Sequence, residues 1–192
     1  GYPEGVYRVG PLGRLNAVDQ IDTPLANAEL QRFKALNHGL PVENTLHYHY
    51  ARLIETLFAA ERARVLLEDP DILSTDIRNT HQEPHEQGVG VIEAPRGTLI
   101  HHYWVNAYGQ ISKANLIVAT GHNNYAMSKA VDDVAKTYVH GPDISEGMLN
   151  RVEHAIRAHD PCLSCSTHAV GSMPMEVSVY DPQGNLLRVI KR

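Results

Sequence analysis

The stretch DPCLSCSTH, residues 160–168, places two cysteines three positions apart and a histidine three positions after the second cysteine. It contains both cysteines of the 192-residue chain. Thiolates and imidazoles are typical ligands of transition metals. Two thiolates and one imidazole do not complete the coordination that most metals prefer. The sequence therefore predicts half of a metal centre and raises the question of where the other half lies.

Several ordinary interpretations of this stretch can be compared. Two free cysteines are often small buried side chains, but the polar neighbours here are unlike a core segment. A thioredoxin-like redox pair would open a helix directly after a strand, whereas this pair follows a helical pattern. A c-type haem attachment would need the histidine immediately after the second cysteine. A zinc site with one further ligand fits better, although no second paired motif supplies that ligand.

Length and charge narrow the class of protein. A chain of 21.3 kDa is long enough for one domain with a substantial core. Its net charge of −5 gives no electrostatic reason to expect nucleic acid or an anionic membrane as a partner. Apolar runs such as LIVA, residues 116–119, are too short to cross a bilayer. Without a secretory signal or a disulfide framework, we expect a reduced, cytoplasmic protein. The chain starts at Gly1 in a loop-like stretch, which suggests a fragment of a longer protein.

Hydrophobic spacing predicts helices in the first third of the chain. Thr23 and Pro24 are typical of a helix start. A longer helix is expected from Pro41 until Asp69-Pro70 stops it. Its expected buried stripe consists of Leu46, Tyr50, Leu53, Ile54, Leu57 and Phe58. A polar surface loop is expected over residues 70–87.

The remainder alternates between strand and helix signals. Segments 88–95, 97–106 and 110–119 have strand-like content, and we expect a hairpin of two strands around residues 107–109. Helices are expected over about 123–139, with Tyr125 and Tyr138 available for packing, and from Asp143 or Ser145 up to Asp160. A second hairpin surrounds PQGN near the end. The predicted fold class is mainly α with small β hairpins, an α+β protein.

Four blocks together resemble one family, the large subunit of nickel–iron hydrogenases. DPCLSCSTH is similar to its C-terminal signature, and GVGVIEAPRGTLIHHYW (88–104) is similar to its Glu-Ala-Pro-Arg-Gly segment. ANLIVATGHNNYAM (114–127) and GVYRVGPLGRLN (5–16) look like the cytoplasmic, bidirectional members, which are NAD-linked or linked to deazaflavin or heterodisulfide pathways. The resemblance runs along the whole chain but covers only the C-terminal part of a large subunit.

The resemblance implies two metal sites. Cys162 would be a terminal nickel ligand, and Cys165 would bridge nickel to an iron that carries carbonyl and cyanide ligands. Two further thiolates would come from a second CxxC motif outside these residues. His168, with the backbone carbonyl of Leu116, would hold a magnesium-type ion near the end of the mature chain.

The resemblance also implies roles around the nickel–iron pair. Arg96 would lie over the open coordination position with Asp160 as its acidic partner, Pro95 would line the diatomic ligands, and Thr120 would donate its hydroxyl to a cyanide. Ordinary alternatives stay open for three of them. Arg96 could be an exposed charge, Thr120 a turn residue before Gly121, and Asp160 the residue that ends a helix before proline.

By the same resemblance, the function would be the reversible oxidation of H2, with Cys162 as the first proton acceptor. Electrons would pass to an iron–sulfur small subunit, then to further electron-transfer subunits of diaphorase type. Residues 1–168 would form the C-terminal part of the catalytic domain. Residues 169–192 would be an extension that a maturation endopeptidase removes after nickel-insertion proteins have acted, and the tail hairpin could hold the CxxC region open for loading.

Three rival interpretations remain. Large subunits of respiratory quinone-reducing complexes share ancestry with this family but lack the nickel cysteines, and both C-terminal cysteines are present here. A non-catalytic, zinc-stabilised Cys2His module predicts stoichiometric zinc in the isolated chain. An inactive truncated product is the third.

Overall fold

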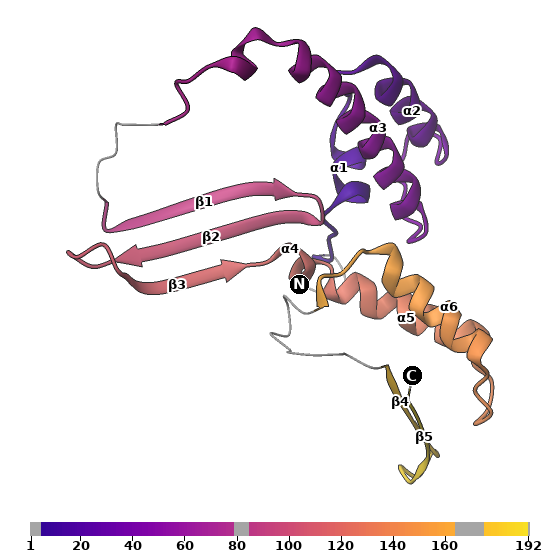
Figure 1. The fold of residues 1–192 in the computed structure, drawn as a ribbon. Coiled ribbons are helices and arrows are strands. Elements are labelled where there is room, and N and C mark those ends of the chain that lie inside the picture. The colour runs from indigo at the N-terminus through magenta and orange to yellow at the C-terminus, as the bar shows by residue number, and fades with distance from the viewer. Residues whose placement is uncertain (1–4, 79–84, 164–174, 192) are drawn as a thin grey trace.

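The computed structural model describes residues 5–78, 85–163 and 175–191. Two groups of helices lie on either side of the point where a long three-stranded sheet meets them, and a separate hairpin follows at the C-terminal end (Figure 1). This arrangement confirms the predicted mixture of helices and small antiparallel sheets. None of the helices in the described residues combines the length and apolarity needed to cross a membrane.

The first helical group contains α1 (Pro11–Ala17), α2 (Pro24–Ala35) and α3 (His47–Glu68). Helix α1 was not predicted, because the opening stretch looked like a loop. It begins with Pro11 at a first-turn position, after Gly10 with φ of 87°, and proline is favoured there since its missing N–H has no intrahelical partner. The three helices enclose most of the buried core, which comprises Leu12, Leu15, Ala26, Leu30, Phe33, Val42, Tyr48, Ala51, Ile54 and Ala158.

Helix α3 corrects the prediction for this region in two ways. It starts at His47 rather than Pro41. Its buried positions are Tyr48, Ala51 and Ile54, three residues apart, and the side chains on this stripe face the core. Leu46 and Leu53 of the predicted stripe are 53% and 66% exposed. The helix ends where Asp69-Pro70 was expected to stop it, and the 3-10 helix η1 (Pro70–Leu73) follows.

The sheet is an antiparallel meander of β1 (Gln87–Ala94), β2 (Gly97–Val105) and β3 (Ile111–Ile117). The expected hairpin around residues 107–109 is the β2–β3 connection. The prediction missed that β1 also pairs with β2, through a tight turn in which Ala94 lies opposite Gly97. This turn contains Pro95 and Arg96, and Figure 1 shows it at the end of the sheet nearest the helices.

The second helical group contains α4 (Ala119–His122), α5 (Asn124–Tyr138) and α6 (Glu146–Ala158). Ser145 caps α6 as predicted, because its hydroxyl accepts a hydrogen bond from the Met148 backbone N–H. In α5 the buried residues are alanines, whereas the predicted packing residues Tyr125 and Tyr138 are largely exposed. Close helix packing favours the smaller side chains at this interface. The predicted tail hairpin is present as β4 (Glu176–Tyr180) and β5 (Leu186–Lys191).

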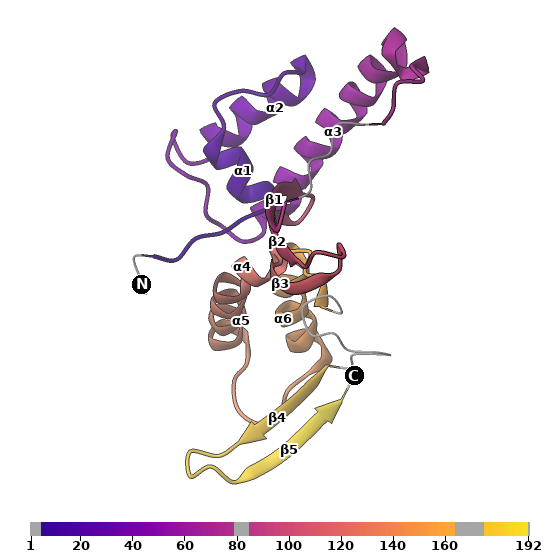
Figure 2. The same cartoon turned by 90° about the vertical axis from the view of Figure 1, so that its left-hand side faces the viewer.

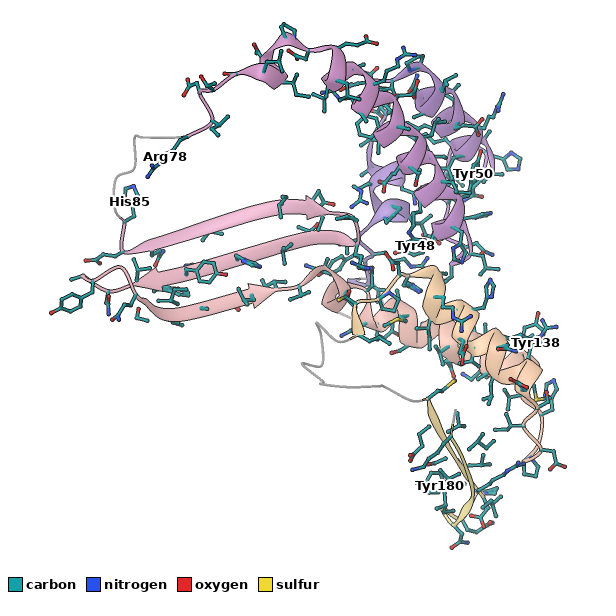
Figure 3. The ribbon with its side chains drawn as sticks, in the orientation of Figure 1. Tyr48, Tyr50, Arg78, His85, Tyr138 and Tyr180 are labelled. Atoms are coloured by element: carbon teal, nitrogen blue, oxygen red, sulfur yellow. The ribbon has the colours of Figure 1, made fainter. Side chains whose placement is uncertain are left out.

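Tyr48 and His159 join the two helical groups. Figure 3 shows Tyr48 at the end of α3 that faces the second group, and its ring centroid lies 4.8 Å from that of His159, which follows α6. His159 is only 3% exposed, and its Nδ1 lies 3.1 Å from the carbonyl oxygen of Ala155. A carbonyl can only accept, so Nδ1 carries a hydrogen and the ring is neutral in this tautomer. The segment leading to Cys162 therefore starts from a fixed, buried point.

Burial of His159 predicts a loss of stability in acid. Desolvation lowers the pKa of His159 below its ordinary value of 6.5, helped by Arg8 and Arg52 and opposed by its bond to Ala155. The unfolded chain then binds this proton more readily than the folded chain, so the stabilisation present above pH 6.5 is lost as the pH falls from there toward the folded-state pKa. We expect His159→Phe to reduce the fall in Tm between neutral and mildly acidic pH. The exposed His140, changed to Gln, serves as the control, and an identical acid response of wild type and His159→Phe would contradict the prediction.

Candidate metal centre

Cys162 lies just after α6, where the chain turns sharply. Asp160 adopts a left-handed conformation with φ of 50°, which aspartate tolerates better than most residues. The backbone N–H of Cys162 then donates a 3.1 Å hydrogen bond to the hydroxyl oxygen of Thr120 in α4. Thr120 is buried, so this bond fixes the backbone of the cysteine against the start of the second helical group. Cys165 and His168 lie outside the described residues.

Arg96 and Asp160 form an ion pair beside this bond. The Nε of Arg96 donates to the backbone carbonyl of Asp160 at 2.8 Å and lies 3.2 Å from its carboxylate Oδ2. Its Nη2 lies 3.5 Å from Oδ1. The turn of the sheet is thus tied to the end of α6, only two residues from Cys162. In this chain the two side chains are 44% and 41% exposed.

A small polar network holds these elements together. The backbone N–H of Val9 donates to Asn123 Oδ1 at 2.9 Å, and the Tyr48 hydroxyl donates to the Val9 carbonyl at 3.0 Å. Asn123 joins α4 to α5, Tyr48 belongs to α3, and Val9 precedes α1. Burial raises the pKa of Tyr48 to about 12, so its hydroxyl stays protonated as a donor. One extended segment of the chain therefore links both helical groups.

The chain is similar to known proteins over most of its length. A model of the nickel-dependent hydrogenase family matches residues 1–168. The chain belongs to this family. The match includes all of DPCLSCSTH and ends at its histidine. The family resemblance drawn from the sequence blocks is confirmed, whereas the quinone-reducing, zinc-module and dead-fragment interpretations are not favoured.

Individual hydrogenase subunits are similar along nearly the whole chain. The NAD-reducing hydrogenase HoxS subunit beta of Cupriavidus necator is 49% identical over 97% of this chain and 39% of its own length. A subunit of the F420-non-reducing hydrogenase vhc of Methanococcus voltae is 44% identical over 97% of this chain and 40% of its own length. A crystal structure of an NAD+-reducing [NiFe]-hydrogenase in the H2-reduced state matches with a TM-score of 0.81 and 50% identity, over 88% of this chain and 37% of that one. The chain thus spans about two fifths of the length of these relatives.

The described residues fit a share of the family's nickel centre. Cys162 offers a soft sulfur donor on a backbone anchored by Thr120, with a permanent cation, Arg96, tied to the same loop. Cys162 is disulfide-bonded in the structure, so metal ligation requires reduction to the thiolate. Among the described residues there is no group of three or more His, Cys, Asp and Glu side chains able to hold an ion. This agrees with a centre whose other ligands come from outside the described part of the hydrogenase chain.

The structure brings together Arg96, Thr120, Asp160 and Cys162, four of the predicted site residues. Pro95 neighbours Arg96 in the same turn, and Leu116 lies on β3 opposite His101. Sequence reasoning gave no role to Arg14, Tyr48, Asn123 or His159. Arg14 and Asn123 do belong to blocks that resemble the hydrogenase family, which was the available signal. Tyr48 and His159 carried none, because their role depends on contacts between distant helices.

Proposed function

We propose that this chain is part of the large subunit of a nickel–iron hydrogenase that oxidises H2 reversibly. One observation carries the proposal: the turn containing Arg96 and the loop containing Cys162 are joined by the Arg96–Asp160 pair. Two sequence blocks that lie 64 residues apart thereby converge on one cysteine. Family membership and the similarity to an NAD+-reducing [NiFe]-hydrogenase support the same function.

The chain's own residues would divide the work between ligation and proton handling. When bound, the nickel–iron centre, with carbonyl and cyanide ligands on iron, supplies the heterolytic cleavage of H2. Cys162 ligates through its thiolate sulfur and, after reaction, holds the released proton at Sγ. Cys165 adds the bridging thiolate. A thiolate suits proton acceptance because its pKa range lies close to neutral.

The surrounding side chains would stabilise this arrangement. The guanidinium of Arg96 keeps its charge at all working pH values, so it orients ligands rather than accepting protons. Asp160 holds that guanidinium in place. Thr120 accepts a bond from Cys162, and its own O–H can donate to a cyanide, since a hydroxyl both accepts and donates. Pro95 contributes an apolar wall.

We further propose that residues 1–168 belong to the mature large subunit, whereas residues 169–192 form a removable extension. The family match ends at residue 168, and Figure 2 shows the β4–β5 hairpin beyond α5 and α6, away from the three-stranded sheet. Accessible placement suits cleavage by a maturation endopeptidase once nickel-insertion proteins have acted. His168 and the Leu116 carbonyl would then hold a magnesium-type ion.

The proposed partners follow from the need to remove electrons. The two cysteines of this chain cannot ligate an iron–sulfur cluster in addition to nickel, so electrons would leave through an iron–sulfur small subunit, then through diaphorase-type subunits in the cytoplasm. The relatives are named as subunits of NAD-reducing and F420-non-reducing hydrogenases, which supports a multisubunit enzyme.

The test uses the complete large subunit, purified anaerobically with its small subunit. We expect nickel in the large subunit, reduction of a redox dye that depends on H2, and an intact mass whose C-terminus falls at His168. Stoichiometric zinc in place of nickel, with no H2-dependent dye reduction, would refute the proposed function. A mass that retains residues 169–192 in the active enzyme would refute the removable extension alone.

A further inference from the structure

Arg14, in α1, makes more hydrogen bonds than any role as a surface charge requires. A guanidinium has five N–H donors. Nε and Nη2 bind the two carboxylate oxygens of Glu55 at 2.6 and 2.7 Å, in the bidentate geometry that fits arginine best. The remaining donors bind Glu93 at 2.9 Å and the carbonyls of Ala94 and Pro95, both at 2.9 Å. Every N–H of the side chain is therefore used.

Three of these bonds end on the turn that carries Arg96. Glu93 and Ala94 close β1, and Pro95 immediately precedes Arg96. Glu93 also accepts a hydrogen bond from Thr98 across the turn. Burial alone would raise the pKa of Glu93, but the bonds from Thr98 and Arg14 outweigh it and lower that pKa. The acceptor is thus a carboxylate, and α1 holds the turn through charge-assisted bonds, which are the stronger kind.

The backbone of the turn is also pressed against the segment before α1. A Cβ built on Gly97, where φ is 131°, would lie 2.3 Å from Val9 Cγ2, and one built on Gly10 would lie 2.9 Å from the Arg96 carbonyl oxygen. Only glycine allows this approach. Contact on one side and Arg14 on the other leave the turn little freedom to move.

We infer that Arg14 is a positioning residue, which places the Arg96 guanidinium beside Cys162 by clamping the 93–96 turn to α1 and, through Glu55, to α3. The inference rests on the proposed role of Arg96 at the nickel–iron centre. It is distinct from that role because Arg14 itself bonds only to Glu55 and the turn in the described residues. Lysine cannot replace it, since an ammonium offers three donors from one point.

The test compares Arg14→Lys and Arg14→Gln with wild type in the complete enzyme. The control is Arg32→Gln, which removes an arginine of α2 that is 73% exposed and paired with Glu29. We expect amide exchange in a peptide spanning residues 93–98 to become about tenfold faster in the Arg14 variants only. Turnover should fall by about a hundredfold, as expected for a displaced catalytic group, with nickel content and the KM for H2 retained.

Combination with Arg96→Lys separates positioning from a general effect on folding. If Arg14 acts through Arg96, adding Arg14→Lys to Arg96→Lys should cost little further turnover, because coupled residues are not additive. Wild-type exchange in the 93–98 peptide, or losses that multiply in the double variant, would overturn the inference. Should Arg14→Gln fail to load nickel, Arg14→Lys and the exchange measurement still decide it. If the wild-type enzyme has no H2 turnover, the proposed function fails, while the exchange result still decides whether Arg14 holds the turn.

Discussion

Replacing Cys162 by serine is expected to leave the large subunit without bound nickel and without H2 turnover. A serine hydroxyl is a hard donor that stays protonated at neutral pH, whereas nickel is held by soft thiolates. The substitution keeps the backbone N–H that donates to Thr120, so the loop retains its anchor. We expect the nickel content, measured by elemental analysis after anaerobic and reducing purification, to fall by about tenfold or more.

The control for Cys162→Ser is His154→Gln. His154 is an exposed imidazole on the same α6 helix, so its loss removes a metal-binding side chain without touching the proposed centre. Nickel content should then match wild type. Retention of nickel by Cys162→Ser, with turnover intact, would show that this sulfur is not a ligand. Equal loss of nickel from both variants would instead indicate adventitious binding to surface side chains.

Local signals were sufficient to predict much of the fold. Ser145 caps α6, Asp69-Pro70 ends α3, and the strand-like segments form strands, because each depends on residues close in sequence. The leucines predicted to be buried on α3 show where such reasoning fails. Which face of a helix is buried depends on the helices packed against it, and here α1 and α2 select Tyr48 and Ile54 instead.

The same distinction applies to the site. DPCLSCSTH and the 93–97 block indicate chemistry because a metal demands particular donors at particular spacings. Those blocks do not say what keeps them together. That task falls to Arg14, Val9 and Asn123, whose composition is ordinary and whose importance comes only from contacts across 79 to 114 residues of sequence. The hydrogenase resemblance covered Arg14 and Asn123 without assigning them a role.

The Arg96→Lys variant is expected to keep its nickel and lose turnover by about two to three orders of magnitude, the cost of removing a preorganised donor beside a reacting centre. Lysine retains the charge but not the planar fork that bonds both the Asp160 carbonyl and its carboxylate. Stability should change little, because an ion pair this exposed is worth about 1 kcal/mol or less. Dye reduction with H2 measures turnover, elemental analysis measures nickel, and thermal unfolding measures stability.

The matched control is Arg157→Lys, which makes the same substitution in an exposed ion pair with Glu153 on α6. It should alter neither turnover nor nickel content, because it leaves the turn and the Cys162 loop untouched. Wild-type turnover in Arg96→Lys would remove Arg96 from the mechanism. Loss of nickel together with turnover would instead assign Arg96 to the assembly of the centre. Turnover lost with nickel retained is the one result that requires a guanidinium, rather than a positive charge alone, beside the cysteine.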